Sequence, residues 1–419
     1  METAKSHHQC RLLRSIKRGA LPMLLIAVFA AGVAAAASGP LSARNVHLVG
    51  RLDLEGGGMV DVKGDIAVVG HMGPPYAATL LDVADPARPM ILARIPVRTG
   101  THSHKARLCG NLLTINVERY GGGGDGTAGL AIFDIADAGH PKEIAYYRMG
   151  GLSTGGTGVH RFQMDCPRKL VYASGSADGF QGNIVSIIDI SAPARPREIG
   201  RWWMPGQHAA AGEKSPSSGS AYRIHHPLRL GDRLYVSLWY DGFAILDISD
   251  PARPRLVSHV GDRPESGAPT HTALPVGHRI LGQDWLVVFD EEMGGGNPPA
   301  YMRLYNITEE RRPVPAATFH VRPDPAGMTG GRFGAHQPHE SVGTDNLVYA
   351  AWFSGGLRVI DISNPYRPTE VGHYIPQPGQ GTRFAQSNDV FVDERGLIYL
   401  IDRVSGLDIL RQSPDHQCR

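Results

Sequence analysis

The segment GLRVIDISNPYRP, residues 356–368, joins an alternating apolar stretch to an aspartate and two prolines. The alternation predicts a β-strand, and the Asp and Pro residues predict a turn directly after it. Related segments recur along the chain, at intervals of 52 to 59 residues between their Asp or Asn positions. They are TLLDVADPARP (79–89), AIFDIADAGHP (131–141), SIIDISAPARP (186–196), AILDISDPARP (244–254) and the divergent RLYNITEERRP (303–313).

Each copy of the repeat belongs to a unit of four predicted strands. Apolar strands precede each copy, as in RLYVSLW (233–239), and another follows it, as in PREIGRWW (196–203). Four strands repeated at this spacing are typical of a β-propeller. A truncated unit, GLDILRQS (406–413), stops after its third strand, and residues 44–54 offer the missing fourth. The sequence therefore predicts an all-β, seven-bladed propeller in which an N-terminal strand completes the last blade and removes an exposed edge.

The repeat resembles the LVIVD-repeat family, whose motif stands here as LRVIDIS (357–363) and FAILDIS (243–249). The resemblance spans residues 44–411 and departs from the pattern at Asn306 and Arg411, which take the aspartate position. It implies a propeller from a bacterial or archaeal group of mostly exported proteins, and it implies no particular activity.

The N-terminus reads as an export signal. Basic residues up to Arg18 precede a mostly apolar run that ends in alanines near Ala37, which is typical of a cleaved signal peptide. We expect residues 1–37 to be this signal, 38–43 a short linker, 44–411 the propeller and 412–419 a tail, with the mature protein periplasmic or secreted. An uncleaved membrane anchor is the alternative, because the run is nearly long enough to span a bilayer. The formal charge of +2 gives no electrostatic case for nucleic acid.

Histidines recur where the first strand of a blade enters the central channel. Blades two to six place them at matching starts, whereas blade one has Gly58 and blade seven Asn388 at that position. The five are His104, His160, His225, His271 and His336, with His339 close to the last of them. Neutral imidazole is a ligand of iron, copper and zinc, and separate strands can present several to one ion. The pattern predicts a transition-metal site (Fe, Cu or Zn) at the top of the channel; the alternative is that these rings hydrogen-bond neighbouring loops.

The same face carries long loops and candidate catalytic groups. Loops of varied length on a rigid scaffold are where binding and catalysis usually reside. The candidates for proton transfer or for orienting the imidazoles are Glu340, Asp389, Glu291 and Tyr240. The histidine-rich propeller resembles, in fold, the carotenoid oxygenases with four iron-binding histidines and the copper-associated methanethiol oxidase proteins. This resemblance implies a metal-dependent oxidoreductase, with hydrolysis by metal-activated water as a weaker possibility.

A second function class stays open. A non-catalytic propeller would use its top loops to bind a cell-envelope protein or a glycan, whereas an enzyme would bind a small molecule there. Export also permits disulfides. Cys109 and Cys166 occupy corresponding turns of neighbouring blades on the bottom face, and we expect them to pair; three free thiols or a bridge to Cys418 are the alternatives.

Overall fold

The computed structural model describes residues 39–119, 128–150, 156–214, 223–261, 267–295, 298–321 and 330–413. Ser38–Arg419 forms one compact unit. The predicted signal peptide and Cys418 lie outside the described residues. Within the described ranges, no helix is long and apolar enough to cross a membrane.

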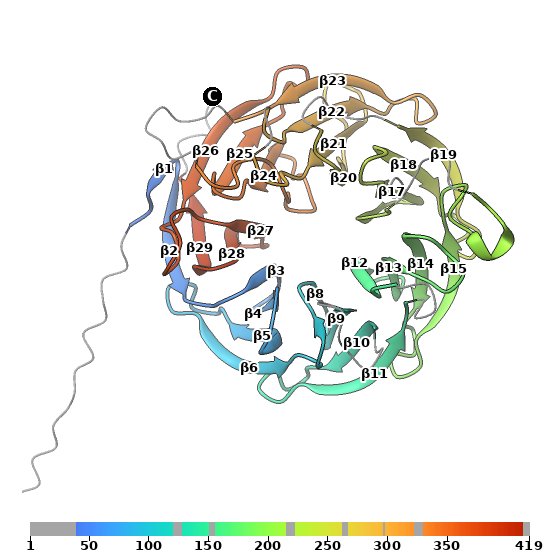
Figure 1. The fold of residues 1–419 in the computed structure, drawn as a ribbon. Coiled ribbons are helices and arrows are strands. Elements are labelled where there is room, and N and C mark those ends of the chain that lie inside the picture. Colours follow the sequence, from blue (N-terminus) through green and yellow to red (C-terminus); the bar gives the residue numbers. More distant parts are fainter. Residues whose placement is uncertain are drawn as a thin grey trace, which may run out of the picture. The chain divides into compact units, whose positions relative to one another are not determined.

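Seven antiparallel sheets form a ring, as the sequence predicts (Figure 1). Blade one consists of β3 (Gly57–Lys63), β4 (Ile66–His71), β5 (Tyr76–Asp82) and β6 (Met90–Pro96). Blade two consists of β7 (Thr101–His102), β8 (Ala106–Cys109), β9 (Leu112–Arg119), β10 (Gly129–Asp134) and β11 (Lys142–Arg148). Blade three consists of β12 (Val159–Asp165), β13 (Leu170–Ser176), β14 (Asn183–Asp189) and β15 (Arg197–Trp202). A short 3-10 helix, η2 (Ala209–Ala211), follows it.

The remaining blades keep the same order of strands. Blade four consists of β16 (Pro227–Leu230), β17 (Arg233–Ser237), β18 (Phe243–Asp247) and β19 (Arg255–Val260). Blade five consists of β20 (Thr270–Pro275), β21 (Trp285–Asp290), β22 (Met302–Asn306) and β23 (Val314–Phe319). Blade six contains β24 (Leu347–Ala351), β25 (Leu357–Asp361) and β26 (Thr369–Ile375), and blade seven contains β27 (Ser387–Val392), β28 (Leu397–Asp402) and β29 (Gly406–Gln412).

The N-terminal segment closes the ring. Strand β2 (Val46–Leu52) pairs antiparallel with β29, from Val46 opposite Gln412 to Leu52 opposite Leu407. This pairing confirms that an N-terminal strand completes the last blade. The segment also reaches further than expected, because β1 (Ser42–Arg44) pairs with β26 of blade six. Asn45, with a φ of 58°, turns the chain between the two strands.

The repeated aspartate closes the turn between the third and fourth strands. In blade four, Asp247 Oδ1 accepts a hydrogen bond from the amide of Ser249 at 2.9 Å. Asn306 accepts the same bond from Thr308 at 3.0 Å, so the divergent copy keeps its turn. The third strands themselves are buried: Phe243–Leu246 are fully covered and pack into the cores between blades. Repeated turns on repeated buried strands thus give a rigid ring that can hold side chains at its centre.

Candidate metal centre

Each blade begins with an irregularity at the position predicted to carry histidine. In blades three and five the register shifts across His160 and His271, so that each of these residues is an extra residue in its strand. In blade four, both His225 and His226 make backbone hydrogen bonds to Ser237. Bulges of this kind redirect side chains and are over-represented beside active sites. In these three blades the irregular start therefore places a histidine in one row of rings.

Six imidazoles form one continuous arc, which we call the imidazole row. Successive ring centroids lie 4.3 to 5.1 Å apart. The row comprises His102, His104, His160, His225, His271 and His336. The first-strand starts predicted five of them; His102 was missed, although the spacing THSH in residues 101–104 offered it.

The gap in the row at blade one has a steric cause. A Cβ added to Gly58 would lie 2.7 Å from the carbonyl oxygen of His104, closer than real Cβ atoms approach. Gly70, on the neighbouring strand, faces the same His104 backbone, where a Cβ would lie 2.8 Å from its carbonyl carbon. Blade one therefore makes room for the histidine strand of blade two and contributes no ring of its own.

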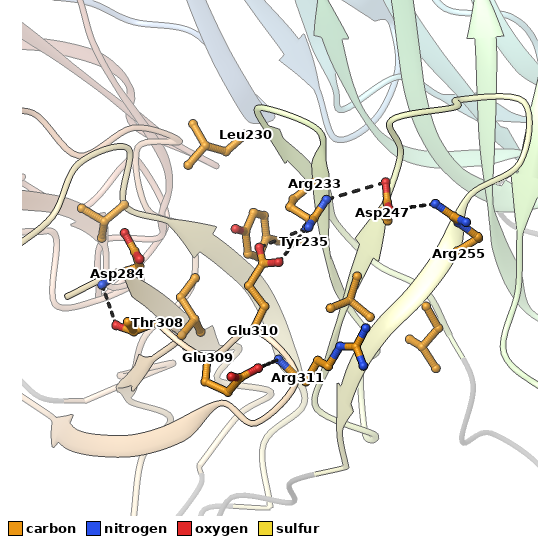
Figure 2. Close-up of a pocket in the computed structure, with 14 residues that line it drawn as sticks. Leu230, Arg233, Tyr235, Asp247, Arg255, Asp284, Thr308, Glu309, Glu310 and Arg311 are labelled. Atoms are coloured by element: carbon orange, nitrogen blue, oxygen red, sulfur yellow. Dashed lines mark hydrogen bonds and ion pairs between the residues drawn. The ribbon is translucent and has the colours of Figure 1, made fainter.

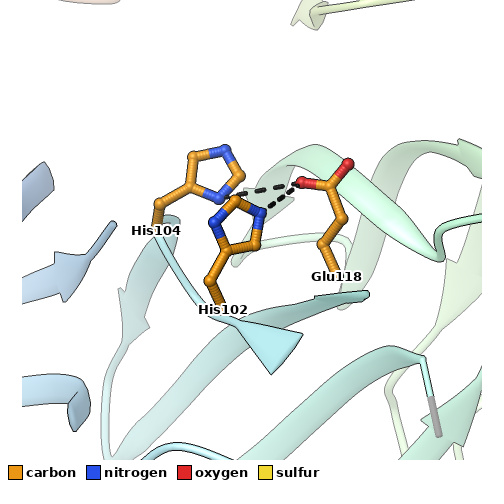
Figure 3. A group of neighbouring side chains, drawn as sticks. All are labelled: His102, His104 and Glu118. Atoms are coloured by element: carbon orange, nitrogen blue, oxygen red, sulfur yellow. Dashed lines mark hydrogen bonds and ion pairs between the residues drawn. The ribbon is translucent and has the colours of Figure 1, made fainter. Parts of the chain in front are cut away.

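Glu118, near the end of β9, contacts three members of the row, and Figure 3 shows two of them, His102 and His104. Its carboxylate accepts hydrogen bonds from His102 Nε2 at 2.9 Å and from His160 Nδ1 at 3.0 Å. His104 Nδ1 lies 3.8 Å from the same carboxylate. Burial alone would raise the pKa of Glu118, but His160 and His102 hold it well below its usual range. Glu118 is therefore a carboxylate that orients imidazoles.

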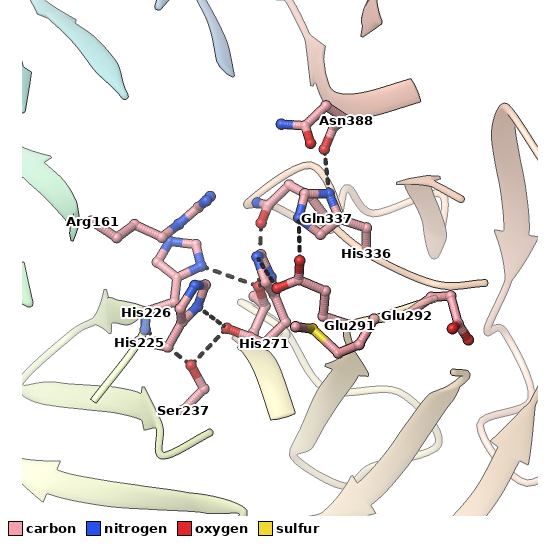
Figure 4. Close-up of polar contacts among 12 residues, drawn as sticks. Arg161, His225, His226, Ser237, His271, Glu291, Glu292, His336, Gln337 and Asn388 are labelled. Carbon is pink, nitrogen blue, oxygen red and sulfur yellow. Dashed lines mark hydrogen bonds and ion pairs between the residues drawn. The ribbon is translucent and has the colours of Figure 1, made fainter. Parts of the chain in front are cut away.

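Glu291, after β21, has the corresponding place on the other side of the row (Figure 4). Its carboxylate oxygens lie 3.8 Å from His271 Nε2 and 3.8 Å from His336 Nε2. Arg332 Nη2 lies 2.7 Å from Glu291 Oε1. Two groups thus bring potential ligand atoms within 4.8 Å of one another: His102, His104 and Glu118, and His225, His271 and Glu291.

The hydrogen bonds at Nδ1 fix which nitrogen of each ring carries a lone pair. His225 Nδ1 lies 2.9 Å from the carbonyl oxygen of His271, and His336 Nδ1 faces the carbonyl oxygen of Asn388. His160 Nδ1 faces the Glu118 carboxylate. Because these oxygens only accept, each Nδ1 carries the proton, and each Nε2 keeps a lone pair. His160 Nε2 and His225 Nε2 nevertheless lie only 3.0 Å apart.

Burial favours the neutral form of His160, His225 and His271. It lowers the pKa of His225 and His271 well below 6.5, and the neighbouring imidazoles lower both further. It also lowers the pKa of His160, although Glu118 opposes the shift. Neutral imidazole is the form that binds metal ions.

Two aromatic side chains pack against the row from strained turns. Trp239 and Phe353 follow the second strands of blades four and six and have φ values of 61° and 44°. A positive φ is costly for bulky residues, and such strain clusters at functional sites. The Trp239 ring lies 4.8 Å from that of His225, and Phe353 stacks on His336 at 4.4 Å. The strained turns thus limit how these imidazoles can rotate.

The other predicted site residues lie elsewhere. Glu340 lies in the channel against Arg107, Arg161 and His226, and the His226 Nε2 contact is 3.1 Å. Asp389 Oδ2 accepts a hydrogen bond from the amide of Val60 at 3.0 Å. Burial raises the pKa of Asp389 to about 6, with Arg161 and Lys105 opposing.

His339 and Tyr240 are not part of the imidazole row. His339 Nδ1 accepts a hydrogen bond from the amide of Val392 at 3.3 Å, and its ring packs edge-on against Phe391. Tyr240 lies beside Trp239, with ring centroids 6.0 Å apart. Because His339 turns to the first strand of blade seven, it does not join the other predicted ligands.

Cys109 and Cys166 form a disulfide between blades two and three. Their Cα atoms lie 5.6 Å apart, which fits the usual span of the bond. The bridge joins the first-to-second-strand turns of the two blades that carry His104 and His160. The imidazole row lies where the first strands of these blades begin, and the disulfide lies at the turns where those strands end.

A groove of 950 Å³ between blades four and five holds none of the predicted site residues (Figure 2). Its charges pair with one another: Arg233 bonds Glu310 at 2.9 Å, and Arg255 bonds Asp247 at 3.1 Å. Two of the arginines that line the groove are therefore engaged in ion pairs.

The LVIVD repeat family matches residues 179–203, 230–262 and 344–375, which lie in blades three, four and six. The chain thus carries LVIVD repeats in a seven-bladed propeller, as its sequence indicated. No curated protein matches the chain.

Solved structures show the same fold at low identity. U3-55K is 12% identical, with 89% of this chain and 100% of that one covered and a TM-score of 0.57. The periplasmic gluconolactonase PpgL of Pseudomonas aeruginosa is 13% identical, with 77% and 86% covered and a TM-score of 0.50. A putative 6-phosphogluconolactonase from Bacteroides fragilis is 9% identical, with 77% and 85% covered and a TM-score of 0.50. At these identities the likeness establishes the fold alone.

Proposed function

We propose that this LVIVD-repeat propeller binds a transition-metal ion in its imidazole row and that the ion makes it a metal-dependent oxidoreductase. The observation that carries the proposal is the pair of Nε2 atoms of His160 and His225, 3.0 Å apart. Both are lone-pair nitrogens, because both Nδ1 atoms donate to oxygen acceptors. Two lone pairs at this distance repel each other unless a proton or a metal ion lies between them, and we assign the metal ion because burial disfavours a proton on these rings.

The separation of the two nitrogens suits a shared metal ion. Nitrogen ligands at about 2.0–2.1 Å from a metal lie roughly 2.9 Å apart at a right angle and roughly 3.4 Å apart at a tetrahedral angle. The observed 3.0 Å falls in this range. We assign His160, His225 and His271 as imidazole ligands and Glu291 as the carboxylate ligand, with His104 and His336 flanking them.

The partners of the imidazoles support the assignment. Metal-binding histidines usually donate their second nitrogen to a carboxylate or a backbone carbonyl, which fixes the ring and raises its basicity. Glu118 has this role for His160, and the carbonyl oxygen of His271 has it for His225. Imidazole with carboxylate suits iron, copper and zinc, and the row contains no thiolate. Iron or copper would supply redox chemistry, whereas zinc would favour hydrolysis by bound water.

The export of the protein is part of the proposal. Basic residues followed by an apolar run near the N-terminus support export, and the Cys109–Cys166 disulfide is of the kind that persists in oxidising compartments. We therefore propose a periplasmic or secreted enzyme that acts on a small molecule at the top of its channel.

Metal analysis of protein purified without a histidine tag tests the proposal. We expect about one iron, copper or zinc ion per chain, the number that one shared site holds. In His225→Ala/His271→Ala this metal should be lost while the circular dichroism spectrum of the propeller is kept. The matched control is His47→Ala/His140→Ala, which removes two exposed histidines outside the row.

The outcomes separate the function classes. Metal-dependent oxygen consumption or dye reduction in wild type, absent from the double variant, supports the oxidoreductase. Wild-type protein that neither contains nor takes up these metals would contradict the proposal and leave the non-catalytic binding propeller as the better interpretation.

A further inference from the structure

Two cationic side chains lie directly after members of the imidazole row. Lys105 follows His104 and Arg161 follows His160, so the two hold equivalent positions in neighbouring blades. Lys105 is 3% exposed and Arg161 is fully buried. Long cationic side chains are almost never buried to this degree unless they are paired.

The ammonium group of Lys105 is unpartnered in the part of the chain that the structure describes. Within the described residues, no hydrogen bond or ion pair reaches Lys105 Nζ, although its backbone amide donates to Asn116. Arg161 is only partly satisfied: Nη2 contacts Glu340 Oε1 at 3.0 Å, but Nε and Nη1 have no hydrogen-bond partner. Buried donors without partners are rare in native proteins, and each one calls for an explanation such as an ion.

The charges around Lys105 and Arg161 favour an anion as their partner. Arg161 repels a charge on Lys105, whereas Asp389 and Glu291 are its neighbours of opposite charge. Glu340 cannot neutralise both cations, because Arg107 and His226 share its carboxylate.

We infer that Lys105 and Arg161 bind a small oxyanion, a carboxylate or a phosphate group, next to the imidazole row. An ammonium group and a guanidinium whose Nε and Nη1 are unpartnered among the described residues suit the oxygens of such a group. The inference rests on the proposed function for its role, since it makes the substrate of the metal centre an anion. The binding of the anion does not itself depend on a metal.

Thermal unfolding in added anion tests the inference. The melting temperature of wild type, metal-free and metal-loaded, is followed in sodium phosphate and in sodium acetate, against sodium chloride at equal ionic strength. We expect phosphate, acetate or both to raise the melting temperature above the chloride value, because a ligand of the folded state stabilises it. Acetate alone would indicate a carboxylate substrate, and phosphate alone a phosphorylated one.

Lys105→Met gives the sharper result. Without added anion this variant should melt above wild type, because it removes a buried, unpaired charge. It should also lose the response to anion, and Arg161→Gln should weaken binding by about tenfold or more, the loss expected for one charge-assisted contact. Lys142→Met, an exposed lysine on blade two, is the matched control and should behave as wild type.

Two results would overturn the inference: no response of wild type above the chloride value, or an unchanged response in both Lys105→Met and Arg161→Gln. Anion stabilisation in protein that binds no metal would reject the proposed function and leave this site in place. Metal binding without any anion effect would reject the anion site and leave the proposed function in place.

Discussion

Replacement of Arg51 by methionine should weaken the junction that closes the ring. Arg51 lies on β2, and its guanidinium bonds Asp408 Oδ1 of β29 at 2.9 Å and the carbonyl oxygen of Ser405 at 2.7 Å. The Asp408 side chain is only 4% exposed. The change therefore leaves a buried carboxylate without its counter-charge.

The expected decrease in the free energy of unfolding follows from these contacts. Removal of one partner of a fully buried ion pair costs about 3–5 kcal/mol. The Arg51 side chain is 22% exposed, which places the loss below that range. Tyr374 also still contacts Asp408. We expect the free energy of unfolding to fall by about 2–3 kcal/mol at pH 8.

The loss should depend on pH with a definite sign. Burial raises the pKa of Asp408 to about 6, with Arg51 opposing, so the folded protein takes up a proton at a pH where the unfolded chain does not. Stability therefore falls as pH rises from about 4 through about 6. Without Arg51 this fall is steeper. At pH 5 the carboxyl is mostly protonated in both proteins, and the loss should shrink to about 1 kcal/mol, the value of the Ser405 hydrogen bond.

Urea unfolding followed by tryptophan fluorescence at pH 5 and pH 8 measures both values. Asp408→Asn is the matched control, and the double variant should recover part of the loss at pH 8 because no charge is stranded. An equal loss at both pH values would refute the reasoning.

Two further predictions concern the scaffold. Deletion of residues 39–54 removes β1 and β2 and exposes the edge of β29, so we expect aggregation on size-exclusion chromatography. Deletion of residues 414–419 should leave the elution of the parent protein unchanged. An unchanged elution of the first variant would mean that another segment closes the ring. Cys109→Ala/Cys166→Ala opens a loop with a sequence separation of 57 residues and should lower stability by about 4 kcal/mol. Alkylation of both cysteines in unreduced protein, or no loss of stability, would exclude the bridge.

The ring was predictable because its signals are local. In five copies an aspartate accepts a hydrogen bond from the amide two residues on, a proline follows, and the strand ends there. The alternation of apolar residues sets which face is buried. Asn306 keeps this turn, which is why the divergent copy did not change the number of blades. The orphan strand could be assigned because the last unit lacked one.

The site was predictable in composition and only partly in arrangement. Matching strand starts identified five imidazoles, but a register shift such as that at His160 depends on pairing between strands and leaves no mark in the residues themselves. His102 joins the row through Glu118, a contact between β7 and β9. His339 follows His336 by three residues, yet it faces Val392, because blade six enters its first turn irregularly before β24 begins at Leu347.

X-ray absorption at the metal edge of the tag-free protein tests the central claim most directly. The account predicts nitrogen and oxygen scatterers at about 2.0–2.1 Å with the outer-shell pattern of several imidazoles, and the loss of that pattern in His225→Ala/His271→Ala. A bound metal with sulfur ligands at about 2.3 Å, or a spectrum that the double variant leaves unchanged, would contradict it.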